Sequence, residues 1–395
     1  MPIPKHLTAD DITGFGREIE AIRNEVMDSR GERDARYIYT LIKVQRSMAL
    51  SARLVIYASL ALLPQWGHAL AGWHFFWPVI ALGTLMLGCA KILENMEIGH
   101  NISHAQWDWL RDPAIQSGSW EWDHVCPSDH WKHSHNVKHH TWTNVFGKDA
   151  DVGGYGLLRL FSNQRWKPFN LGNPLYAVLL AIFFEWGIAI QELELGRVVS
   201  GRLKWSSIRP MWLKTREKMA RQILKDYILF PLLAGPFFLY VCAANAVANV
   251  IRNLWTYLII FCGHFPKDVH VFTKEEVENE TRQHWYVRQL LGSCNIVGGK
   301  LFHIMSGNLS HQIEHHLFPD MPSNRYPEIA PRVRALCERY ALPYNSGSLT
   351  RQFGTTLLRI LRMTFPGYSP LLDGPPPARA RMLGQRGVHA EGGRS

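Results

Sequence analysis

The residues in this chain most able to do chemistry are histidines that occur in three short clusters. Eight of the 19 histidines lie in HNISH at 100–104, HNVKHH at 135–140 and HQIEHH at 311–316. Imidazole nitrogens bind Fe, Cu, Zn and Ni. Two histidines four residues apart share one face of a helix, whereas adjacent ones diverge by about 100°. Three such segments together predict a site with two metal ions. The candidate ligands are His100, His104, His135, His139, His140, His311, His315 and His316.

A carboxylate-bridged di-iron bundle is one alternative to a histidine-ligated site. Such bundles bind metal through Glu-x-x-His pairs, and the chain has two, Glu97–His100 and Glu121–His124. This class leaves seven of the eight clustered histidines unexplained, and the second pair lies in a context unfavourable for a long helix. No His-Glu-x-x-His zinc motif occurs either. The carboxylate-bridged class is therefore disfavoured.

A two-haem cytochrome is the second alternative. It needs haem-ligating histidines inside its apolar helices. The histidines in or beside the apolar segments of this chain are His68, His74 and His264. They are too few and too close to the segment ends, so the haem interpretation is also disfavoured.

Two long segments that are almost free of charge must position the clusters. Residues 54–90 contain no Asp, Glu, Lys or Arg, and residues 227–266 contain only Arg252. One membrane crossing needs about 20 apolar residues, so each segment predicts a helical hairpin. We expect crossings at about 50–66, 73–93, 227–244 and 247–264, with turns near 64–72 and 243–249. Arg252 is expected near the outer interface, where its long side chain can contact water.

A third apolar stretch, residues 174–190, is interrupted by Glu185. We expect it to form a buried or interface-lying helix and not a crossing. Two crossings between the second and third clusters then leave all three on one face of the membrane, as a shared metal site requires. The segments beside both hairpins carry nearly all the Lys and Arg, so the positive-inside rule predicts cytoplasmic clusters and termini.

The charge balance is basic, with 43 Lys and Arg against 33 Asp and Glu. Residues 197–225 hold nine Lys or Arg and one Glu. We interpret this stretch as a collar attracted to anionic lipid, a role compatible with docking an acidic head group or redox partner. No nucleic-acid partner is expected. The N-terminus lacks the residue order of a cleaved signal peptide, and residues 366–395, rich in Gly, Pro and Arg, are expected to be disordered.

The order of the three clusters, interleaved with two apolar hairpins, resembles that of the membrane-bound fatty acid desaturases over about residues 50–345. The strings WKHSHNVKHHTWTNVFGKDAD and GNLSHQIEHHLFPDMPSNRY resemble bacterial acyl-CoA and acyl-lipid desaturases without a fused electron-carrier domain. The resemblance implies an all-α, multi-pass protein with four transmembrane helices and a cytosolic helical cap. It implies one desaturase domain over 1–365, in the bacterial inner membrane, with two non-haem irons held by the histidines of the three boxes.

The resemblance also bears on two less regular positions. The family has one more histidine at the cytosolic end of the fourth span, and His264 occupies that place here. Four residues earlier, where the animal acyl-CoA branch has a water-binding Asn, this chain has Ile260. In the third box, the i, i+4 spacing favours His311 as the partner of His315, but Gln312 stands where some branches have a Gln and could share the role.

Several polar residues near the boxes could orient the ligands. Metal-bound imidazoles usually donate their second N–H to a carboxylate or carbonyl group. The candidates are Asp149, Asp151, Asn308, Gln312 and Glu314. Histidines without the box spacing are expected to be structural or proton-handling, and these are His124, His130, His133, His270, His284 and His303.

The implied reaction is O2-dependent insertion of a double bond into a long-chain acyl-CoA or acyl-lipid, delta-9 being one position open to it. Each turnover needs two external electrons. The six cysteines are scattered, and no Rossmann, flavin or His-Pro-Gly-Gly motif occurs. We therefore expect a separate reductase, electrons ultimately from NAD(P)H, and a ferredoxin, rubredoxin or cytochrome-type carrier.

Two other functions stay open on the sequence. An iron-dependent acyl hydroxylase or alkane-type monooxygenase would use the same ligands and release an oxygenated product. A membrane metal transporter or sensor would use the histidines as a transit site. That last class predicts charged or histidine residues within the spans, and the expected spans are nearly free of them.

Overall fold

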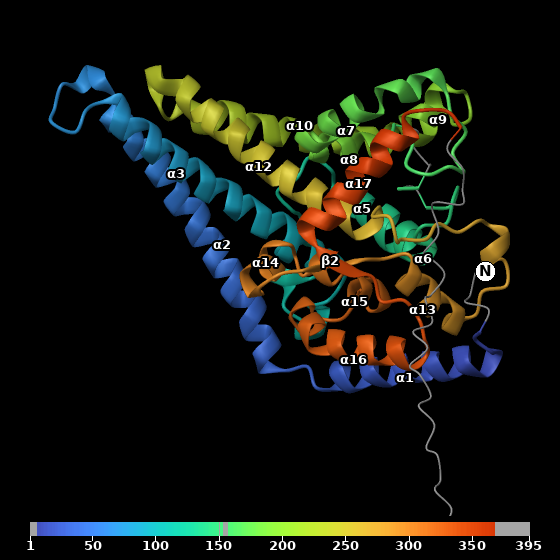
Figure 1. Cartoon of the computed structure of the whole chain (residues 1–395). Helices are drawn as coiled ribbons and strands as arrows, with labels where there is room; N and C mark the ends of the chain where they lie inside the picture. Colours follow the sequence, from blue (N-terminus) through green and yellow to red (C-terminus); the bar gives the residue numbers. More distant parts are fainter. Residues whose placement is uncertain (1–5, 150, 153–156, 368–395) are drawn as a thin grey trace, which may run out of the picture.

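The apolar side of the molecule begins with a hairpin of two long helices, α2 (Glu32–Ser59) and α3 (Trp73–Ile92). They lie side by side and end at the upper left of Figure 1. The structure is a computed structural model that describes residues 6–149, 151–152 and 157–367. The turn falls at residues 60–72, close to the predicted one. Helix α2 begins well before residue 50, and α3 continues through a π-helical segment, Leu93–His100, into α4 (Asn101–Ser103).

The second hairpin is displaced along the chain from its predicted position. Its first arm comprises α10 (Trp205–Ile223), a π-helical segment, Leu224–Leu229, and α11 (Phe230–Leu232), and its second arm is α12 (Phe238–His264). The predicted turn at 243–249 is wrong, because α12 continues through it without a break. The chain turns at Gly235, whose φ of 54° favours glycine, and Pro236. Residues 238–262 contain neither Gly nor Pro and so continue the helix.

Among the described residues, two helical segments are long and apolar enough to cross a membrane, Trp73–Ser103 and Gly235–His264. A bent pair, α7 (Asn173–Ile182) and α8 (Phe184–Glu192), raises the number to three if it counts as one broken span. The chain bends by 101° between the two helices of this pair. The third apolar stretch is therefore no straight crossing. Helix α9 (Leu195–Val199) follows it.

Buried ion pairs join these membrane-side helices. Arg252 is 1% exposed and pairs with Glu185 of α8, and its Nη1 donates to the carbonyl oxygen of Asp123 at 3.1 Å. The prediction that Arg252 contacts water is wrong, because a buried carboxylate compensates its charge. Lys91 lies between Asp226 and Asp123, at 2.8 Å and 3.3 Å.

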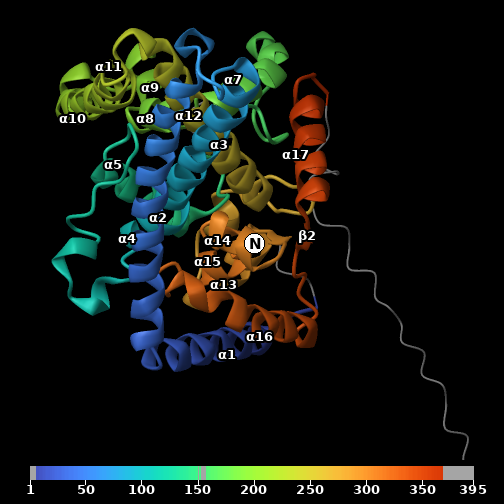
Figure 2. The same cartoon turned by 90° about the vertical axis from the view of Figure 1, so that its left-hand side faces the viewer.

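The cap is helical and lies at the other end of the molecule (Figures 1 and 2). Its core joins α1 (Ala9–Asp28), α13 (Arg282–Leu291) and α16 (Tyr326–Arg339) through buried side chains such as Phe15, Tyr286 and Ile329. The remaining helices and strands are α5 (Ser128–Lys132), α6 (His140–Trp142), α14 (Lys300–Met305), α15 (Gln312–Leu317), α17 (Leu349–Met363), β1 (Asn295–Val297) and β2 (Ser346–Ser348).

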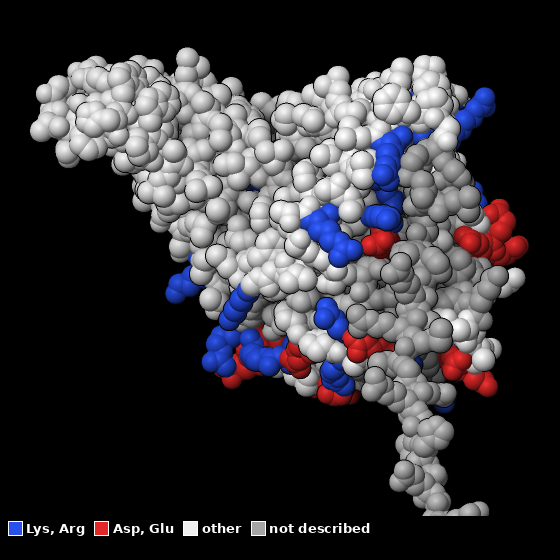
Figure 3. Space-filling view, viewed as in Figure 1, with Lys and Arg blue, Asp and Glu red and all other residues white. Residues whose placement is uncertain are grey.

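The fold is thus mostly helical, and it departs from an all-α chain in a small parallel sheet of β1 and β2. Charged side chains are distributed unevenly over the surface in Figure 3. The upper left, where α2 and α3 meet, shows none, and Lys, Arg, Asp and Glu appear over the lower part and the right-hand side. The predicted disordered tail lies outside the described residues from residue 368 onward.

The Glu185–Arg252 pair yields a stability prediction. Arg252→Met leaves the Glu185 carboxylate buried without its cation, which costs about 3–5 kcal/mol of unfolding free energy. The double variant Glu185→Gln/Arg252→Met should recover part of that loss. Arg36→Ala, which breaks an exposed pair with Glu32, should cost at most about 1 kcal/mol. Denaturant unfolding in detergent measures all three, and an Arg252→Met variant as stable as Arg36→Ala would contradict the assignment.

Candidate metal centre

Each histidine box lies on a short, irregular helical segment. The first box begins at the end of the π-helical segment Leu93–His100, and the second follows α5 through another, His133–His139. The third begins in a 3₁₀ turn, Leu309–His311, and continues into α15. His264 is the last residue of α12. Wider π turns are frequent at functional sites, and here they set the direction of the histidines of the first two boxes.

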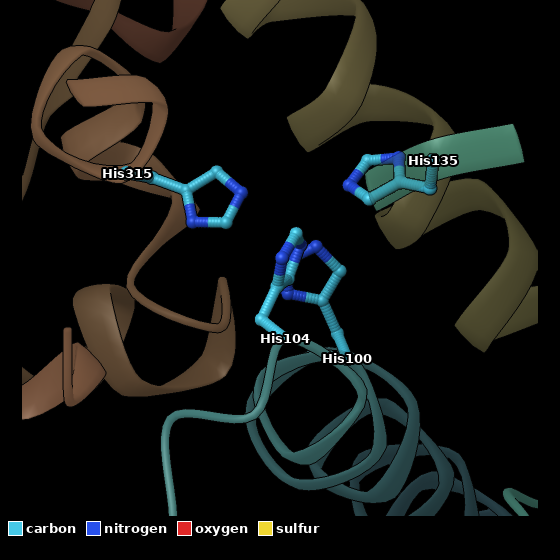
Figure 4. A group of neighbouring side chains, drawn as sticks. All are labelled: His100, His104, His135 and His315. Carbon is cyan, nitrogen blue, oxygen red and sulfur yellow. The ribbon is translucent and has the colours of Figure 1, made fainter. Parts of the chain in front are cut away.

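The first group of histidines joins all three boxes. His100, His104, His135 and His315 each offer a ring nitrogen, and these nitrogens all lie within 4.8 Å of one another. Figure 4 shows the four rings around a common space, contributed by three separate parts of the chain. The Nε2 atoms of His100, His104 and His315 are buried and have no hydrogen-bond partner among the described residues.

A second group lies beside the first. His139, His264 and His316 also offer nitrogens within 4.8 Å of one another. His140 lies between the groups, because it forms a third set with His315 and His316 and its Nε2 is 3.2 Å from Nε2 of His135. The structure therefore brings eight imidazoles into two adjoining groups, as expected for a site with two metal ions.

The structure does not bring His311 into these groups. His311 precedes α15 with φ −99° and ψ 55°, so no helical i, i+4 relation to His315 exists. Its ring lies instead 4.5 Å from that of His303. Gln312 lies at the site where His311 was predicted. Its Nε2 is 2.9 Å from Nε2 of His264, and its Oε1 is buried without a partner among the described residues.

Of the residues expected to orient ligands, Gln312 contacts His264, and the two aspartates contact His139. Asp149 and Asp151 lie 3.0 Å and 3.4 Å from Nδ1 of His139. Asn308 donates to Glu97 instead, and Glu314 accepts from Asn295 and Tyr344. The remaining histidines join no group of candidate ligands in the described part of the chain, namely His124, His130, His133, His270, His284 and His303.

Other side chains contact the ligand rings at Nδ1 and were missed by the sequence analysis. Asn101 lies 3.1 Å from Nδ1 of His100, and the Tyr326 hydroxyl is 3.3 Å from that of His315. His316 has Gln289 at 3.1 Å and Thr143 at 3.2 Å. Asn101 lies inside the first box, Thr143 follows the second by three residues and Tyr326 follows the third by ten, whereas Gln289 belongs to a separate helix, α13.

Burial keeps most of these imidazoles neutral. It lowers the pKa of His135, His140, His315 and His316 well below the usual value. His139 is different. Burial alone would lower its pKa, but the carboxylates of Asp149 and Asp151 outweigh burial and raise the pKa to about 9. A carboxylate behind a ligand imidazole fixes its orientation and makes it more basic.

An apolar cavity of about 510 Å³ adjoins the histidines. His100, His135, His139 and His264 form part of its wall. The rest is mainly apolar and comes from residues 157–160, α7, α8 and α12, and it includes Leu158, Leu160, Leu180, Phe184, Ile188 and Ile260. This volume is typical of a small-molecule site. An apolar chain could thus lie directly against the imidazole groups.

The donor set fits transition metals. Buried polar atoms without partners cost about 1–3 kcal/mol each, so a cluster of unpartnered ring nitrogens is costly unless something binds them. Neutral imidazoles suit Fe, Cu, Zn and Ni. The two adjoining groups offer enough nitrogens for two such ions.

Comparison with known proteins identifies the class of protein. Residues 71–348 match the family model described as fatty acid desaturase. The chain belongs to the fatty acid desaturase family and is therefore an oxidoreductase, as its three boxes predict. It is 47% identical over 365 residues to the "NADPH-dependent stearoyl-CoA 9-desaturase" of Mycobacterium tuberculosis, covering 91% of this chain and 82% of that protein.

More distant relatives are also named as desaturases. "Fatty acid desaturase 3" of Homo sapiens is 27% identical over 312 residues, which cover 72% of this chain and 61% of that protein. The "sn-1 linoleoyl-lipid 6-desaturase" of Synechocystis is 24% identical over 307 residues, 75% of this chain and 83% of that protein.

Metal content tests whether His311 of the third box is a ligand, with His315 of the same box as the comparison. His311→Ala should keep the metal content of the unchanged chain, because His311 lies outside both groups. His315→Ala should lower it, because His315 belongs to two of the three sets of ligand nitrogens. Elemental analysis of purified, dialysed protein gives the number of metal ions per chain. Equal loss in both variants would show that His311 is a ligand after all.

Proposed function

We propose that this chain is an O2-dependent desaturase that forms a double bond at carbon 9 of a long-chain acyl-CoA such as stearoyl-CoA. The observation that carries the proposal is the apolar cavity whose wall includes His100, His135, His139 and His264. The chain belongs to the fatty acid desaturase family, and the position and substrate follow the name of the mycobacterial relative.

We assign two non-haem irons to the two histidine groups. One iron would be bound by His100, His104, His135, His140 and His315. The other would be bound by His139, His264 and His316, with Gln312 beside it. When bound, the irons would supply the activation of O2 that removal of hydrogen from an unactivated methylene requires. His311 has no part in this assignment.

The reaction balances with two electrons from outside the chain. One –CH2–CH2– unit, O2, two electrons and two protons give –CH=CH– and two molecules of water. We propose that the electrons come from NADPH, in line with the relative's name. They would pass through a separate reductase and a ferredoxin, rubredoxin or cytochrome-type carrier, because no nucleotide or flavin motif and no cysteine cluster occurs in the sequence.

The residues of the chain act mainly by positioning. Leu158, Phe184 and Ile188 line the cavity and would hold the acyl chain with one methylene pair toward the histidines. Trp131 stacks on His135 with ring centroids 4.2 Å apart, which limits rotation of that imidazole. Asp149 holds His139 through Nδ1. Held in this way, substrate and oxidant react as if within one molecule.

We propose four membrane crossings in the bacterial inner membrane, formed by α2, α3, the end of the α10–α11 arm beyond the basic residues 197–225, and α12. Two of these helices, α3 and α12, belong to segments that are long and apolar enough to cross a membrane. His100, which follows α3, and His264, which ends α12, both lie at the cap end of their helices. An even number of crossings between the boxes would therefore leave all three boxes on one face of the membrane. The basic residues nearby favour the cytoplasmic face for the boxes and for both termini. Residues 1–365 would form a single domain.

Product analysis tests this function. Expressed with a reductase and carrier, the chain should yield a new C18 chain with one double bond at carbon 9, located by mass spectrometry after derivatisation. His315→Ala/His316→Ala should abolish it, because both residues belong to the proposed iron ligands. A hydroxylated chain as the product would instead establish a hydroxylase. Absence of both products from a chain that holds no iron would overturn the di-iron assignment.

The cavity wall should determine chain length. Ile188→Trp places a larger ring in the cavity and should lower the ratio of activity on C18 to activity on C16 substrates by roughly tenfold, as one or two methylenes are worth in apolar pockets. Leu175→Trp is the matched control, because Leu175 is 60% exposed on α7 and does not line the cavity. Competition between the two acyl chains in one reaction measures the ratio. An unchanged ratio in Ile188→Trp would place the acyl chain elsewhere.

A further inference from the structure

Helix α17 has its polar side inward and its apolar side outward. Its buried residues are Gln352, Thr356, Arg359, Ile360 and Met363. Its outer side, with the residue that follows the helix, is formed by Phe353, Leu357, Leu358, Leu361 and Phe365, which are 39%, 42%, 44%, 44% and 60% exposed. The helix begins at residue 349, just after the family match ends at 348.

Polar groups on the inner side of α17 form hydrogen bonds inside the protein. Gln352 Nε2 donates to Sγ of Cys294 at 2.8 Å. Arg359 Nη2 donates to the carbonyl oxygens of Pro266 and Lys267 at 2.8 Å and 3.1 Å. These contacts set the rotation of the helix about its axis, so the leucines and phenylalanines must point outward.

Helix α16 shows the opposite pattern and serves as a comparison. It buries Tyr326, Ile329, Val333 and Leu336, as expected for a helix that faces water. In water, the arrangement of α17 would leave a contiguous apolar stripe exposed, which is unfavourable. In contact with lipid the same stripe is favourable.

The position of α17 agrees with a lipid contact. Ile360 shares an apolar cluster with Tyr257, Phe261 and Phe265, at the end of α12 where the span meets the cap. Helix α17 also packs against α7, whose Leu175 and other outer residues are exposed. Figure 2 places α17 at the outer edge of the molecule, at the level of α3 and α12 and away from α1 and α16.

The length and direction of α17 distinguish lying in the interface from crossing. Its 15 residues extend about 22 Å at 1.5 Å each, less than the roughly 30 Å of a hydrocarbon core. In Figure 1 it runs across the direction of α3 and not along it. The side chain of Arg351 in its first turn is 66% exposed. Lys267, next to the middle of α17, and Lys167, next to its end, are also exposed, as cations at headgroup level should be.

We propose that α17 is an interfacial helix whose outer side, formed by Phe353, Leu357, Leu358, Leu361 and Phe365, inserts into the lipid bilayer at the boundary between the spans and the cap. An amphipathic helix of this kind lies with its apolar face buried at the headgroup–acyl boundary. The apolar surface of α7 continues the same contact.

The lipid contact also supports the wall of the cavity, a consequence that rests on the proposed function. Arg159 Nη1 donates to the carbonyl oxygens of Met363 and Phe365 at 2.9 Å and 3.3 Å, and Trp166 Nε1 to that of Thr364 at 2.9 Å. These carbonyls belong to the end of α17, where helices lack internal partners. Leu158 and Leu160, on either side of Arg159, line the cavity.

Spin-label accessibility tests the proposal on the full chain. Leu358→Cys carries a nitroxide in vesicles of phosphatidylethanolamine and phosphatidylglycerol, and Ala335→Cys on the exposed side of α16 is the matched control. Relaxation by O2 reports lipid, and relaxation by a water-soluble nickel chelate reports water. We expect the ratio of O2 to nickel accessibility to be several-fold higher at residue 358 than at residue 335. The unsubstituted chain, labelled in parallel, gives the background from its six cysteines.

Equal ratios at the two positions would overturn the proposal. Leu361→Cys, close to one turn further along the same side, repeats the test if the first variant does not fold. Because accessibility is read without turnover, the result does not depend on whether the chain desaturates an acyl-CoA. Failure of the proposed function and failure of this inference can therefore be distinguished.

Discussion

The rest of the structure depends on the burial of eight imidazoles in one place. They come from four separate segments, and their ring nitrogens form adjoining sets whose members lie within 4.8 Å of one another. Burial keeps most of these rings neutral, because it disfavours their charged form. Several ring nitrogens are left without a partner in the described part of the chain, so the cluster is suited to metal ions. Each segment must direct its histidines toward this cluster, and π-helical or 3₁₀ turns lie at the boxes where that direction is set.

The histidine cluster has polar surroundings on one side and apolar surroundings on the other. Toward the cap, the rings contact Asp149, Tyr326 and Gln289, which hold them through Nδ1. Toward the bent pair α7–α8 they adjoin an apolar cavity. Polar contacts on one side and apolar contacts on the other allow the same imidazoles to be held rigidly and to face an unreactive hydrocarbon chain. The bend between α7 and α8 matters because it brings both helices to the cavity wall, which one straight crossing could not do.

The buried cations of the membrane-side helices are each paired with a buried carboxylate. Arg252 and Lys91 are almost fully buried, and each has a carboxylate partner from a distant segment, Glu185 and Asp226 respectively. Such pairs add little stability over apolar residues but make the wrong arrangement costly. Helix α17 follows the same rule at the surface, since its polar groups bond inward and its apolar ones face outward.

The family, the first hairpin and the residue types of the candidate metal site follow from the amino-acid sequence alone. These features are local: uncharged length predicts a crossing, and the order of three histidine boxes is specific. The tertiary structure decided what local spacing cannot express. Gln312 and not His311 lies at the site, because residue 311 is in a turn and the helical spacing does not apply there. Gln289 contacts the ring of His316 from a separate helix, and Tyr326 contacts that of His315 because the chain folds back after the third box. The second turn moved to Gly235, and Arg252 turned inward, because its partner lies 67 positions earlier in the chain, where only packing can bring the two charges together.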